Sequence, residues 1–355
     1  MIAAVYHGPE DLRVEEHPTP AAAPGEIVLR VDHASICATD LRILRGSHRK
    51  YVPGTVRVPG HEVVGTIVEL GKGVVGDYRI GQRVFVAPNV GCGRCRQCER
   101  GENNLCANYA ALGITLDGAF AEYMRVPAPY LEQGNLIHFA DSIEGAAAAL
   151  AEPFACVLHG QQALRVSNDD VVLIIGAGPI GVMHTIAAKA SGAKKILVSE
   201  QSPERLRKAS QAGADRVVNF LEENLRDVVA AETGGSGADV IVVAAGVRQA
   251  MEEAPRLGAI GGRINLFAGL PSEAPQIQLD ANLIHYKELI VTGTTGCNTA
   301  DCKRSMDLIS SGKIDLRPLI SGHYRLDRAN EAFAAVRAGN SLKVVLDINS
   351  GKGLV

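Results

Sequence analysis

Residues 171–190 read VVLIIGAGPIGVMHTIAAKA, in which a continuous apolar run leads into the glycine pattern G-x-G-x-x-G. The apolar run predicts a strand covered on both faces of a sheet, and the residues after the glycines predict a helix. In this strand-loop-helix setting, the loop indicates a pyrophosphate site at the positive N-terminus of the helix. One glycine permits the tight turn, the second lets the backbone approach the pyrophosphate, and the third lets helix and strand pack closely. The candidate cofactor contacts in this loop are Gly176, Gly178, Pro179, Ile180 and Gly181.

An acidic residue follows the next predicted strand, residues 196–198. Glu200 lies about twenty residues after Gly181, where an acid binds the adenosine ribose hydroxyls and repels a 2′-phosphate. We therefore expect NAD rather than NADP. Arg205 works against this preference, because a nearby arginine can accommodate such a phosphate. The alternative is a glycine-rich turn followed by a surface glutamate, and the combination of strand, loop, helix and acid argues against it.

Strands and helices alternate through the middle of the chain. Further strands are predicted at residues 217–218, 240–243 and 263–267, and helices at residues 203–212 and 221–231. This alternation predicts an α/β domain with a doubly wound parallel sheet. Such sheets bind ligands at the carboxyl ends of their strands. We therefore assign the residues after two of these strands, and two threonines further on, to cofactor contact: Ala245, Ala268, Gly269, Leu270, Thr294 and Thr295.

The first 150 residues have a different character. Short β-branched runs at residues 27–31, 63–68 and 83–86 alternate with glycine and proline, which predicts a mostly β domain. After about residue 295 the pattern predicts a helix at residues 302–310 and strands near residues 344–346. Because the N-terminal part looks incomplete alone, we expect this last segment to rejoin it.

Composition excludes several classes of function. The chain has 355 residues with 36 basic and 39 acidic side chains, so its charge gives no reason to expect nucleic acid or a membrane as partner. Its first residues lack a basic segment followed by an apolar core, and no run of about 18 apolar residues occurs. We therefore expect a cytoplasmic protein in a reducing compartment, where clustered cysteines more often bind metal than form disulfides.

Four of the eight cysteines form one cluster with the spacing C-x2-C-x2-C-x7-C. Four thiolates in a short loop suit tetrahedral zinc with no open position, which is typical of a structural site. An iron–sulfur cluster commonly has a last gap of three followed by proline, which this loop lacks, and a redox C-x-x-C does not need the further cysteines. We therefore predict structural zinc on Cys92, Cys95, Cys98 and Cys106.

Other candidate ligands are scattered along the chain. Cys37 stands in Ser-Ile-Cys-Ala-Thr-Asp, and His61 and Glu62 stand in Pro-Gly-His-Glu before a β-branched run. Glu152 follows the apolar residues 146–151 and precedes a proline, so its carboxylate needs a partner. Taken singly, none of these residues is strong evidence for a metal site.

Taken together, the Cys37 segment, Gly60-His61-Glu62, the four-cysteine loop and the glycine loop resemble the zinc-dependent medium-chain dehydrogenase/reductase family. The resemblance covers essentially the whole chain and is greatest to the polyol (sorbitol-like) and threonine dehydrogenase branch. It implies a GroES-like, mostly β catalytic domain at residues 1–150 and 291–355, and a Rossmann NAD-binding domain at residues 151–290. It also implies one catalytic and one structural zinc and a homo-oligomer, either dimer or tetramer.

Roles follow from the resemblance, position by position. Cys37 and His61 match the first two catalytic zinc ligands, and Glu62 and Glu152 match two acids of that branch. Which of the two glutamates binds zinc directly stays open. Thr39 matches the residue that hydrogen-bonds the substrate hydroxyl and starts proton removal. For Asp40 we weigh two roles, orienting a metal ligand and capping a helix.

This chain also departs from the family pattern. Many relatives have a histidine relay residue where Arg42 stands, so we expect protons to leave through His48 or water. The Arg-Tyr pair of sorbitol dehydrogenases is missing before Cys297. A basic stretch of Arg42, Arg45, His48, Arg49 and Lys50 suits a phosphorylated polyol or a solvated loop. We expect no ligand role for four further residues: Cys156, His159, Cys297 and Cys302.

These observations favour an NAD-dependent zinc enzyme that transfers a hydride from a secondary alcohol to NAD, and we expect that alcohol to be a polyol or polyol phosphate. Oxidation of an amino-acid alcohol, as by threonine dehydrogenase, is the alternative within the same fold. The alternative from another class is a redox sensor that binds NAD and zinc without turnover. Intact Thr39, Cys37, His61 and Glu152 argue against it, because a sensor does not need an open metal site.

Overall fold

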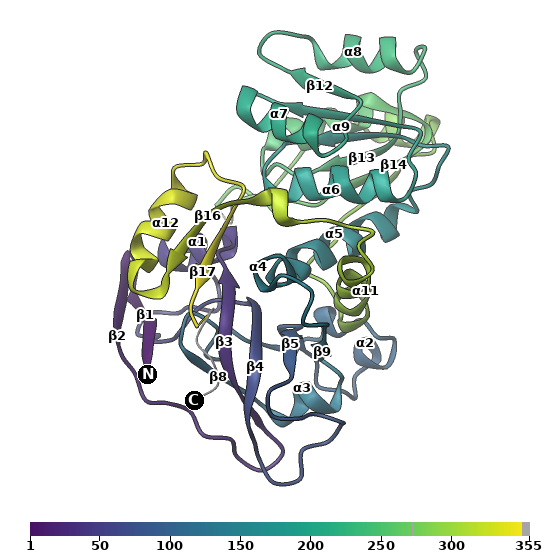
Figure 1. The fold of residues 1–355 in the computed structure, drawn as a ribbon. Helices are drawn as coiled ribbons and strands as arrows, with labels where there is room; N and C mark the ends of the chain where they lie inside the picture. Colours follow the sequence, from purple (N-terminus) through teal and green to yellow (C-terminus); the bar gives the residue numbers. More distant parts are fainter. Residues whose placement is uncertain (272, 350–355) are drawn as a thin grey trace. The chain divides into compact units, whose positions relative to one another are not determined.

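The apolar run at residues 171–175 forms a central strand of a six-stranded parallel sheet (Figure 1). The computed structural model describes residues 1–271 and 273–349. All five residues of this strand are buried, as expected for a strand between two parallel neighbours. Across the sheet the strands are β12 (Arg216–Asn219), β11 (Lys195–Glu200), β10 (Val171–Ile175), β13 (Ala238–Val243), β14 (Gly258–Leu266) and β15 (Ile290–Thr292).

Helices connect these strands and pack against them. Helix α6 packs on β10 and β11, α7 on β11 and β12, and α9 on β13 and β14. The expected doubly wound parallel sheet is thereby confirmed. The helices are α6 (Pro179–Ala190), α7 (Pro203–Gln211), α8 (Leu225–Glu232), α9 (Arg248–Leu257) and α10 (Ala281–Tyr286).

Helix α8 begins later than the sequence pattern suggested, since a helix was expected from residue 221. The side chain of Asn224 accepts hydrogen bonds from the backbone N–H groups of Arg226 and Asp227. The side chain of Asn219 accepts the N–H of Leu221. Asparagine favours such turns and helix caps over helix interiors, so a turn follows Asn219 and the helix starts after its cap at Asn224.

A seven-stranded sheet builds the other part of the chain. Strand β3 lies at its centre, with β17 on one side, β4 on the other, and β8 also paired to it. The C-terminal strand β17 thus pairs with an N-terminal strand. In order, the sheet contains β16 (Ile320–Arg325), β17 (Lys343–Asp347), β3 (Ile27–Ser35), β4 (Glu62–Leu70), β5 (Arg83–Val86) and β9 (Leu136–His138), with β8 (Tyr123–Val126) beside β3.

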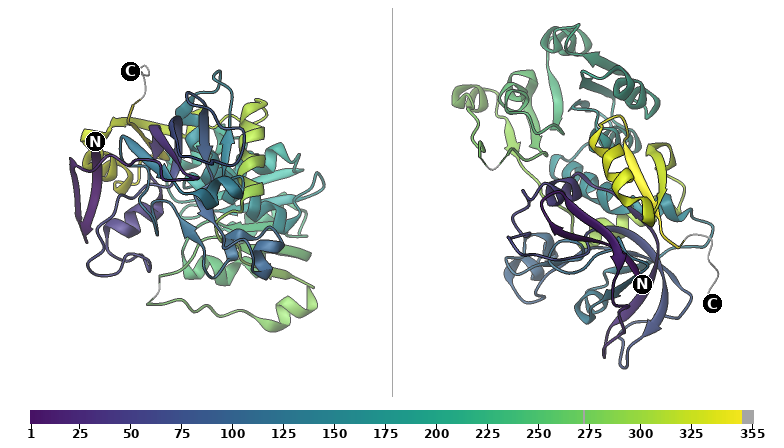
Figure 2. Two further views of the ribbon diagram at one scale, coloured as in Figure 1. Left: turned by 90° about the horizontal axis from the view of Figure 1, so that it is seen from below. Right: turned by 90° about the vertical axis from the view of Figure 1, so that its left-hand side faces the viewer.

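The N-terminal hairpin and the C-terminal elements lie side by side in Figures 1 and 2. The guanidinium of Arg337 on α12 is 2.7 Å from the carboxylate of Glu10 in the hairpin turn. The rings of Phe120 and Phe333 meet edge-on with centroids 5.8 Å apart in the core. The remaining elements here are β1 (Ile2–Gly8), β2 (Asp11–Glu16), α1 (Ala38–Leu44), β6 (Asn89–Val90), α2 (Arg96–Glu99), η1 (Asn103–Leu105), β7 (Ala110–Ala111), α3 (Ala128–Glu132), α4 (Gly145–Ala149), α5 (Ala151–Leu164), α11 (Thr299–Ser310), η2 (Arg317–Leu319), η3 (Leu326–Arg328) and α12 (Ala329–Arg337).

The chain divides into two compact units. Unit 1 comprises Met1–Ala155 and Cys297–Val355, and unit 2 comprises Cys156–Gly296. The sequence placed the two boundaries a few residues earlier, at 150 and 291, and the first observed boundary falls inside helix α5.

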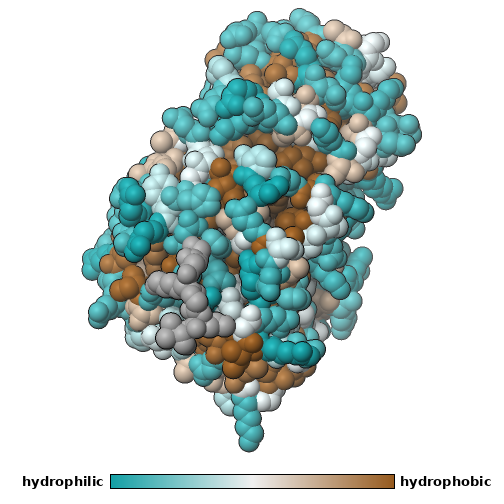
Figure 3. Space-filling model, in the orientation of Figure 1, coloured by the Kyte–Doolittle hydropathy of each residue, from teal (hydrophilic) through white to brown (hydrophobic). Residues whose placement is uncertain are grey.

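Hydrophilic residues cover most of the face shown in Figure 3. Among the described residues, no helix has the length and apolar character needed to cross a membrane.

Candidate metal centres and dinucleotide loop

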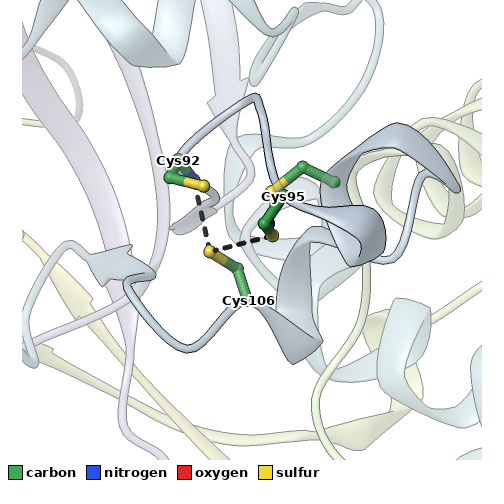
Figure 4. A group of neighbouring side chains, drawn as sticks. Cys92, Cys95 and Cys106 are labelled. Atoms are coloured by element: carbon green, nitrogen blue, oxygen red, sulfur yellow. Dashed lines mark hydrogen bonds between the residues drawn. The ribbon is translucent and has the colours of Figure 1, made fainter.

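The four predicted zinc cysteines come together in the structure. Their sulfur atoms all lie within 4.8 Å of one another. The labelled thiols in Figure 4 point toward a common centre, and the Cys95 and Cys106 sulfurs are 3.8 Å apart. Cys92 follows β6, Cys95 and Cys98 lie at and within α2, and Cys106 follows η1. A closed set of four thiols fits tetrahedral zinc without an open position.

Backbone N–H groups lower the pKa of two of these thiols and so favour the thiolate form that binds metal. The backbone N–H of Arg94 is the main cause that lowers the pKa of Cys92 to about 6. The backbone N–H of Cys98 likewise lowers the pKa of Cys95. Burial instead raises the pKa of the Cys98 thiol to about 11. Zinc binding releases the protons that such thiols retain, because only the thiolate is a ligand.

The second cluster forms where β3 and β4 run side by side. Ser35 at the end of β3 pairs with Glu62 at the start of β4. Cys37 follows the first strand and His61 precedes the second, so the antiparallel pairing brings them together. Ligand atoms of Cys37, His61 and Glu62 lie within 4.8 Å of one another. The strand register therefore assembles three of the four residues that were expected to form the catalytic metal site.

Asp40 fills one of the two roles considered for it, the helix cap, and its second oxygen faces His61. Its carboxylate accepts the backbone N–H of Cys37 at 2.8 Å, which caps helix α1. Its other oxygen lies 3.5 Å from Nδ1 of His61. Burial disfavours a proton on His61, but Asp40 and Cys37 outweigh it and raise the pKa of this imidazole well above its ordinary value. A carboxylate that orients a ligand histidine is common beside metal sites.

The cluster has polar atoms that fit a metal ion. Glu62 is fully buried, and its Oε1 has no hydrogen-bond partner among the described residues. A buried carboxylate oxygen without a partner is costly unless a cation satisfies it. Together with a thiol and an imidazole, this donor set suits zinc with an open position.

Glu152 is not one of the three residues of this group, although its charge helps to raise the pKa of Lys343 beside Glu62. It is buried in the first turn of α5, and its Oε1 is 3.9 Å from the Cys297 sulfur. The Cys297 and Cys302 sulfurs are 3.5 Å apart. The structure therefore brings Glu62, rather than Glu152, to within ligand distance of Cys37 and His61. The place of Glu152 in the metal site stays a prediction.

One buried cation in the cluster was missed in the sequence. The Lys343 ammonium on β17 donates to a carboxylate oxygen of Glu62, and the Ser35 hydroxyl donates to the same oxygen. Lys343 also donates to the Ile36 carbonyl at 3.0 Å. Burial lowers the pKa of Lys343, but Glu62 and Cys37 outweigh this effect and raise it. The sequence signal for this cation was that Lys343 stands directly before the apolar run of a strand. A lysine at such a position is equally expected at a solvent-exposed strand edge, so the signal was not decisive.

The expected proton-transfer residues lie in and after α1. Thr39 is partly exposed, and the Arg42 guanidinium donates to its Oγ1 at 3.3 Å. Burial, reinforced by the charge of Arg42, lowers the pKa of His48 to about 4. His48 is therefore neutral at physiological pH. Arg45, Arg49 and Lys50 are exposed to solvent.

The glycine loop has the geometry of a pyrophosphate cradle. Gly176 has φ +100°, a conformation that other residues rarely adopt. A Cβ on Gly181 would lie 1.8 Å from the Gly176 carbonyl oxygen, so only glycine fits there. At Gly178, which precedes α6, a Cβ would have no neighbour within 4 Å. The backbone at this helix N-terminus is thus open for a phosphate to approach.

Glu200 closes one side of this loop. It is buried, and its carboxylate accepts the backbone N–H of Ala177 at 3.1 Å and that of Gln201 at 2.8 Å. The Arg205 guanidinium lies 3.6 Å from the same carboxylate. Arg205 is therefore already paired with an acid, which lowers its capacity to attract a phosphate.

The other predicted cofactor contacts follow the carboxyl ends of β13, β14 and β15. Ala245 follows β13, and its N–H and Cβ lie next to Gly176. The N–H of Ala268 donates to Val243 at 3.1 Å, and Asn265 donates to the Thr294 hydroxyl at 3.0 Å. Because all these strands are parallel, their ends meet at one edge of the sheet. The predicted residues on this edge are Ala245, Ala268, Gly269, Leu270, Thr294 and Thr295.

Comparison with known proteins gives matches over nearly the whole chain. Residues 23–133 match the alcohol dehydrogenase GroES-like domain, and residues 179–311 match the zinc-binding dehydrogenase domain. The L-threonine 3-dehydrogenase of Rhizobium etli is 33% identical over 351 residues, which is 98% of each chain.

Two solved structures extend the comparison. A zinc-binding dehydrogenase of Sinorhizobium meliloti, bound to NADP, is 30% identical with a TM-score of 0.88 and 98% of each chain covered. The galactitol-1-phosphate dehydrogenase of Escherichia coli is 25% identical with a TM-score of 0.87, over 98% of this chain and 100% of the other.

Proposed function

The chain belongs to the zinc-dependent medium-chain dehydrogenase family, and from this premise we propose that it oxidises a small secondary alcohol that carries an anionic group, with NAD as hydride acceptor. Membership confirms the expected class, an oxidoreductase of the alcohol dehydrogenase type that uses zinc and a nicotinamide dinucleotide. The proposal concerns the substrate, the choice of NAD and the residues that act.

One observation carries the substrate proposal. The Arg42 guanidinium donates to the Thr39 hydroxyl, two residues from Cys37. Thr39 is the residue we assign to the reacting hydroxyl, so a permanent positive charge stands directly beside it. An anionic group close to the oxidised carbon would find a charge-assisted partner there. A polyol phosphate has this chemistry, and so does L-threonine, the substrate in the name of the Rhizobium relative.

The roles of the residues follow from their positions. When bound, zinc polarises the substrate oxygen and NAD accepts the hydride, which is the chemistry these cofactors supply. The Thr39 hydroxyl takes the proton of the substrate hydroxyl while it releases its own proton. Arg42 keeps its own protons at every physiological pH, so we assign onward transfer to His48, which is neutral there, or to water. Asp40 orients His61.

Replacing Arg42 by methionine tests the substrate proposal. We expect KM for the charged substrate to rise about 10- to 100-fold, since a hydrogen bond to a charged group contributes roughly 1.5–3 kcal/mol. Turnover of a neutral secondary alcohol should change little. Initial rates of NAD reduction over L-threonine, polyol phosphates, free polyols and simple alcohols provide the measurement.

The matched control is Arg45→Met, which removes an exposed arginine from the same stretch. Its effect on KM should stay within about twofold. If the wild-type chain oxidises only uncharged alcohols, or if Arg42→Met affects charged and neutral substrates equally, the anionic substrate is wrong.

Replacing Glu200 by glutamine tests the choice of NAD. Glutamine keeps a carbonyl oxygen for the N–H groups of Ala177 and Gln201 but removes the charge that repels a 2′-phosphate. The ratio of kcat/KM for NADP to that for NAD should rise about 10- to 100-fold, the scale of a nearby like-charge repulsion. Arg205→Gln should move the ratio the opposite way. Comparable turnover with both cofactors by the wild type would contradict the role of Glu200.

We also propose a homo-oligomer that forms through the β15 edge of unit 2. Among the described strands, β15 pairs only with β14, so its outer edge offers unpaired backbone groups. Three large apolar side chains near this edge are strongly exposed: Ile260 (80%), Tyr286 (77%) and Ile290 (56%). If β15 pairs with the β15 strand of a second copy, the unpaired backbone groups form hydrogen bonds and the exposed apolar side chains become buried. Such an interface has twofold symmetry.

Ile290→Lys should therefore reduce the oligomer to smaller species. Light scattering coupled to size-exclusion chromatography measures the mass directly. Val247→Lys, which changes an exposed apolar residue outside this edge, is the control and should leave the mass unchanged. A wild-type monomer, or an oligomer that Ile290→Lys leaves intact, would rule out this interface.

A further inference from the structure

A buried ion pair lies beside the candidate catalytic zinc site. Lys343 and Glu62 are almost completely shielded from solvent, and the Lys343 ammonium contacts a carboxylate oxygen of Glu62. Breaking such a buried pair leaves an uncompensated charge. The pair therefore fixes the carboxylate of Glu62 more firmly than a solvated contact would.

The strand register explains why these residues meet. Strand β17 pairs with β3, and Val345 lies opposite Ser35. Strand β3 pairs with β4, and Ser35 lies opposite Glu62. Because side chains alternate along a strand, Lys343 and Val345 share one face of the sheet. Three neighbouring strands thus present the ammonium, the hydroxyl and the carboxylate to one another.

The two oxygens of Glu62 have different surroundings. Oε2 accepts hydrogen bonds from both the Lys343 ammonium and the Ser35 hydroxyl. Oε1 has no hydrogen-bond partner among the described residues. A ligand atom of Glu62 also lies within 4.8 Å of those of Cys37 and His61. Anchoring Oε2 leaves Oε1 as the oxygen available to a cation.

Charge balance gives a second argument. The carboxylates of Asp40 and Glu62 are fully buried, and the partly exposed Cys37 lies close to Glu62. Buried carboxylates in low dielectric repel one another strongly. The Lys343 ammonium offsets part of this repulsion, and the Ile36 carbonyl fixes its position at 3.0 Å.

We propose that Lys343, together with Ser35, is a positioning residue that holds Glu62 so that its Oε1 binds the catalytic zinc. In this proposal the ammonium acts through the carboxylate that it contacts. This inference rests on the catalytic zinc site of the proposed function. It makes Glu62, rather than Glu152, the glutamate proposed to bind zinc directly.

The test measures zinc affinity rather than activity. Full-length Lys343→Met and Ser35→Ala should each bind the catalytic-site zinc about 10- to 100-fold more weakly in competition with a chelator, as is usual when a partner of a ligand is lost. The zinc of the four-cysteine loop should keep its affinity. In the cobalt-substituted protein, the visible spectrum of the Cys37 site should shift in Lys343→Met and return toward wild type in Lys343→Arg.

Controls separate a positioning role from a purely structural one. Lys195→Met removes another strand lysine, paired with Glu232 at 2.9 Å in unit 2, and should leave both zinc affinities unchanged. Wild-type catalytic-site affinity in Lys343→Met and Ser35→Ala would overturn the inference, and so would equal weakening of both zinc sites. If Lys343→Met does not fold, the zinc affinities of Ser35→Ala and Lys343→Arg decide the question. Both variants keep a buried positive charge beside Glu62, so both should fold.

The Cys37→Ser variant tests the premise separately. Loss of one zinc equivalent in that variant, with wild-type behaviour of the Lys343 and Ser35 variants, overturns the inference alone. Retention of both equivalents in Cys37→Ser overturns the proposed zinc site, and the role of Lys343 with it.

Discussion

Cys37→Ser should lower kcat/KM by about a thousandfold or more, because polarisation of the substrate oxygen by a metal ion contributes several kcal/mol to the transition state. Cys37 supplies the sulfur ligand of the cluster that also contains His61 and Glu62. Serine has nearly the same size but is a poor zinc ligand at neutral pH. The fold should survive, since Cys37 is the partly exposed N-cap residue of α1, a position that serine favours.

Two measurements check this result together. Elemental analysis should show that Cys37→Ser loses about one zinc per chain and keeps the other. Initial rates of NAD reduction should show the loss of activity, while NAD binding to unit 2 stays at the wild-type level. Full activity in Cys37→Ser would mean that the zinc mechanism is wrong.

Cys95→Ser should have its main effect on stability. We expect loss of the structural zinc and a fall in Tm of about 10 °C, which corresponds to roughly 3–5 kcal/mol for a unit of this size. Hydrophobic packing stabilises this loop only weakly, because helix α2 has four residues and none of them is buried. A metal that links Cys92, Cys95, Cys98 and Cys106 therefore replaces a hydrophobic core locally.

Calorimetry with and without added zinc checks this second prediction. The Tm of Cys95→Ser should not respond to zinc at concentrations that stabilise the wild type. Cys37→Ser is the matched control, because it removes the other zinc and should lower Tm much less. An unchanged Tm and zinc content in Cys95→Ser would exclude a structural metal in this loop.

The nucleotide-binding half was predictable because its signals are local. The glycine loop, the buried strand before it and Glu200 after the next strand all lie within a short stretch. Gly176 and Gly181 have steric reasons that hold in the structure, namely a φ of +100° and a carbonyl oxygen 1.8 Å from a Cβ. The four-cysteine loop was predictable for the same reason, since its ligands are close in sequence.

The environment of the second metal cluster was not predictable in the same way. Lys343 and Glu62 are 281 residues apart, and only the pairing of β17 with β3 and of β3 with β4 brings them together. Strand register is a tertiary property that a single strand does not reveal. The same holds for the contact between Glu152 and Cys297, which depends on how α5 packs near the start of α11.

Helix starts were the least predictable local feature. Asn224 delays α8 by a side-chain cap, whereas Asn298 and Asp301 cap each other's backbone N–H groups and start α11 three residues before the expected helix. Both effects depend on whether an asparagine side chain folds back on the backbone.

The most direct test of the proposed site is anomalous scattering at the zinc absorption edge from crystals of the zinc-loaded chain. We predict two peaks in each chain, one within the four-cysteine loop and one bonded to Cys37, His61 and Glu62. A single peak in the four-cysteine loop, with no density at Cys37, would contradict the account.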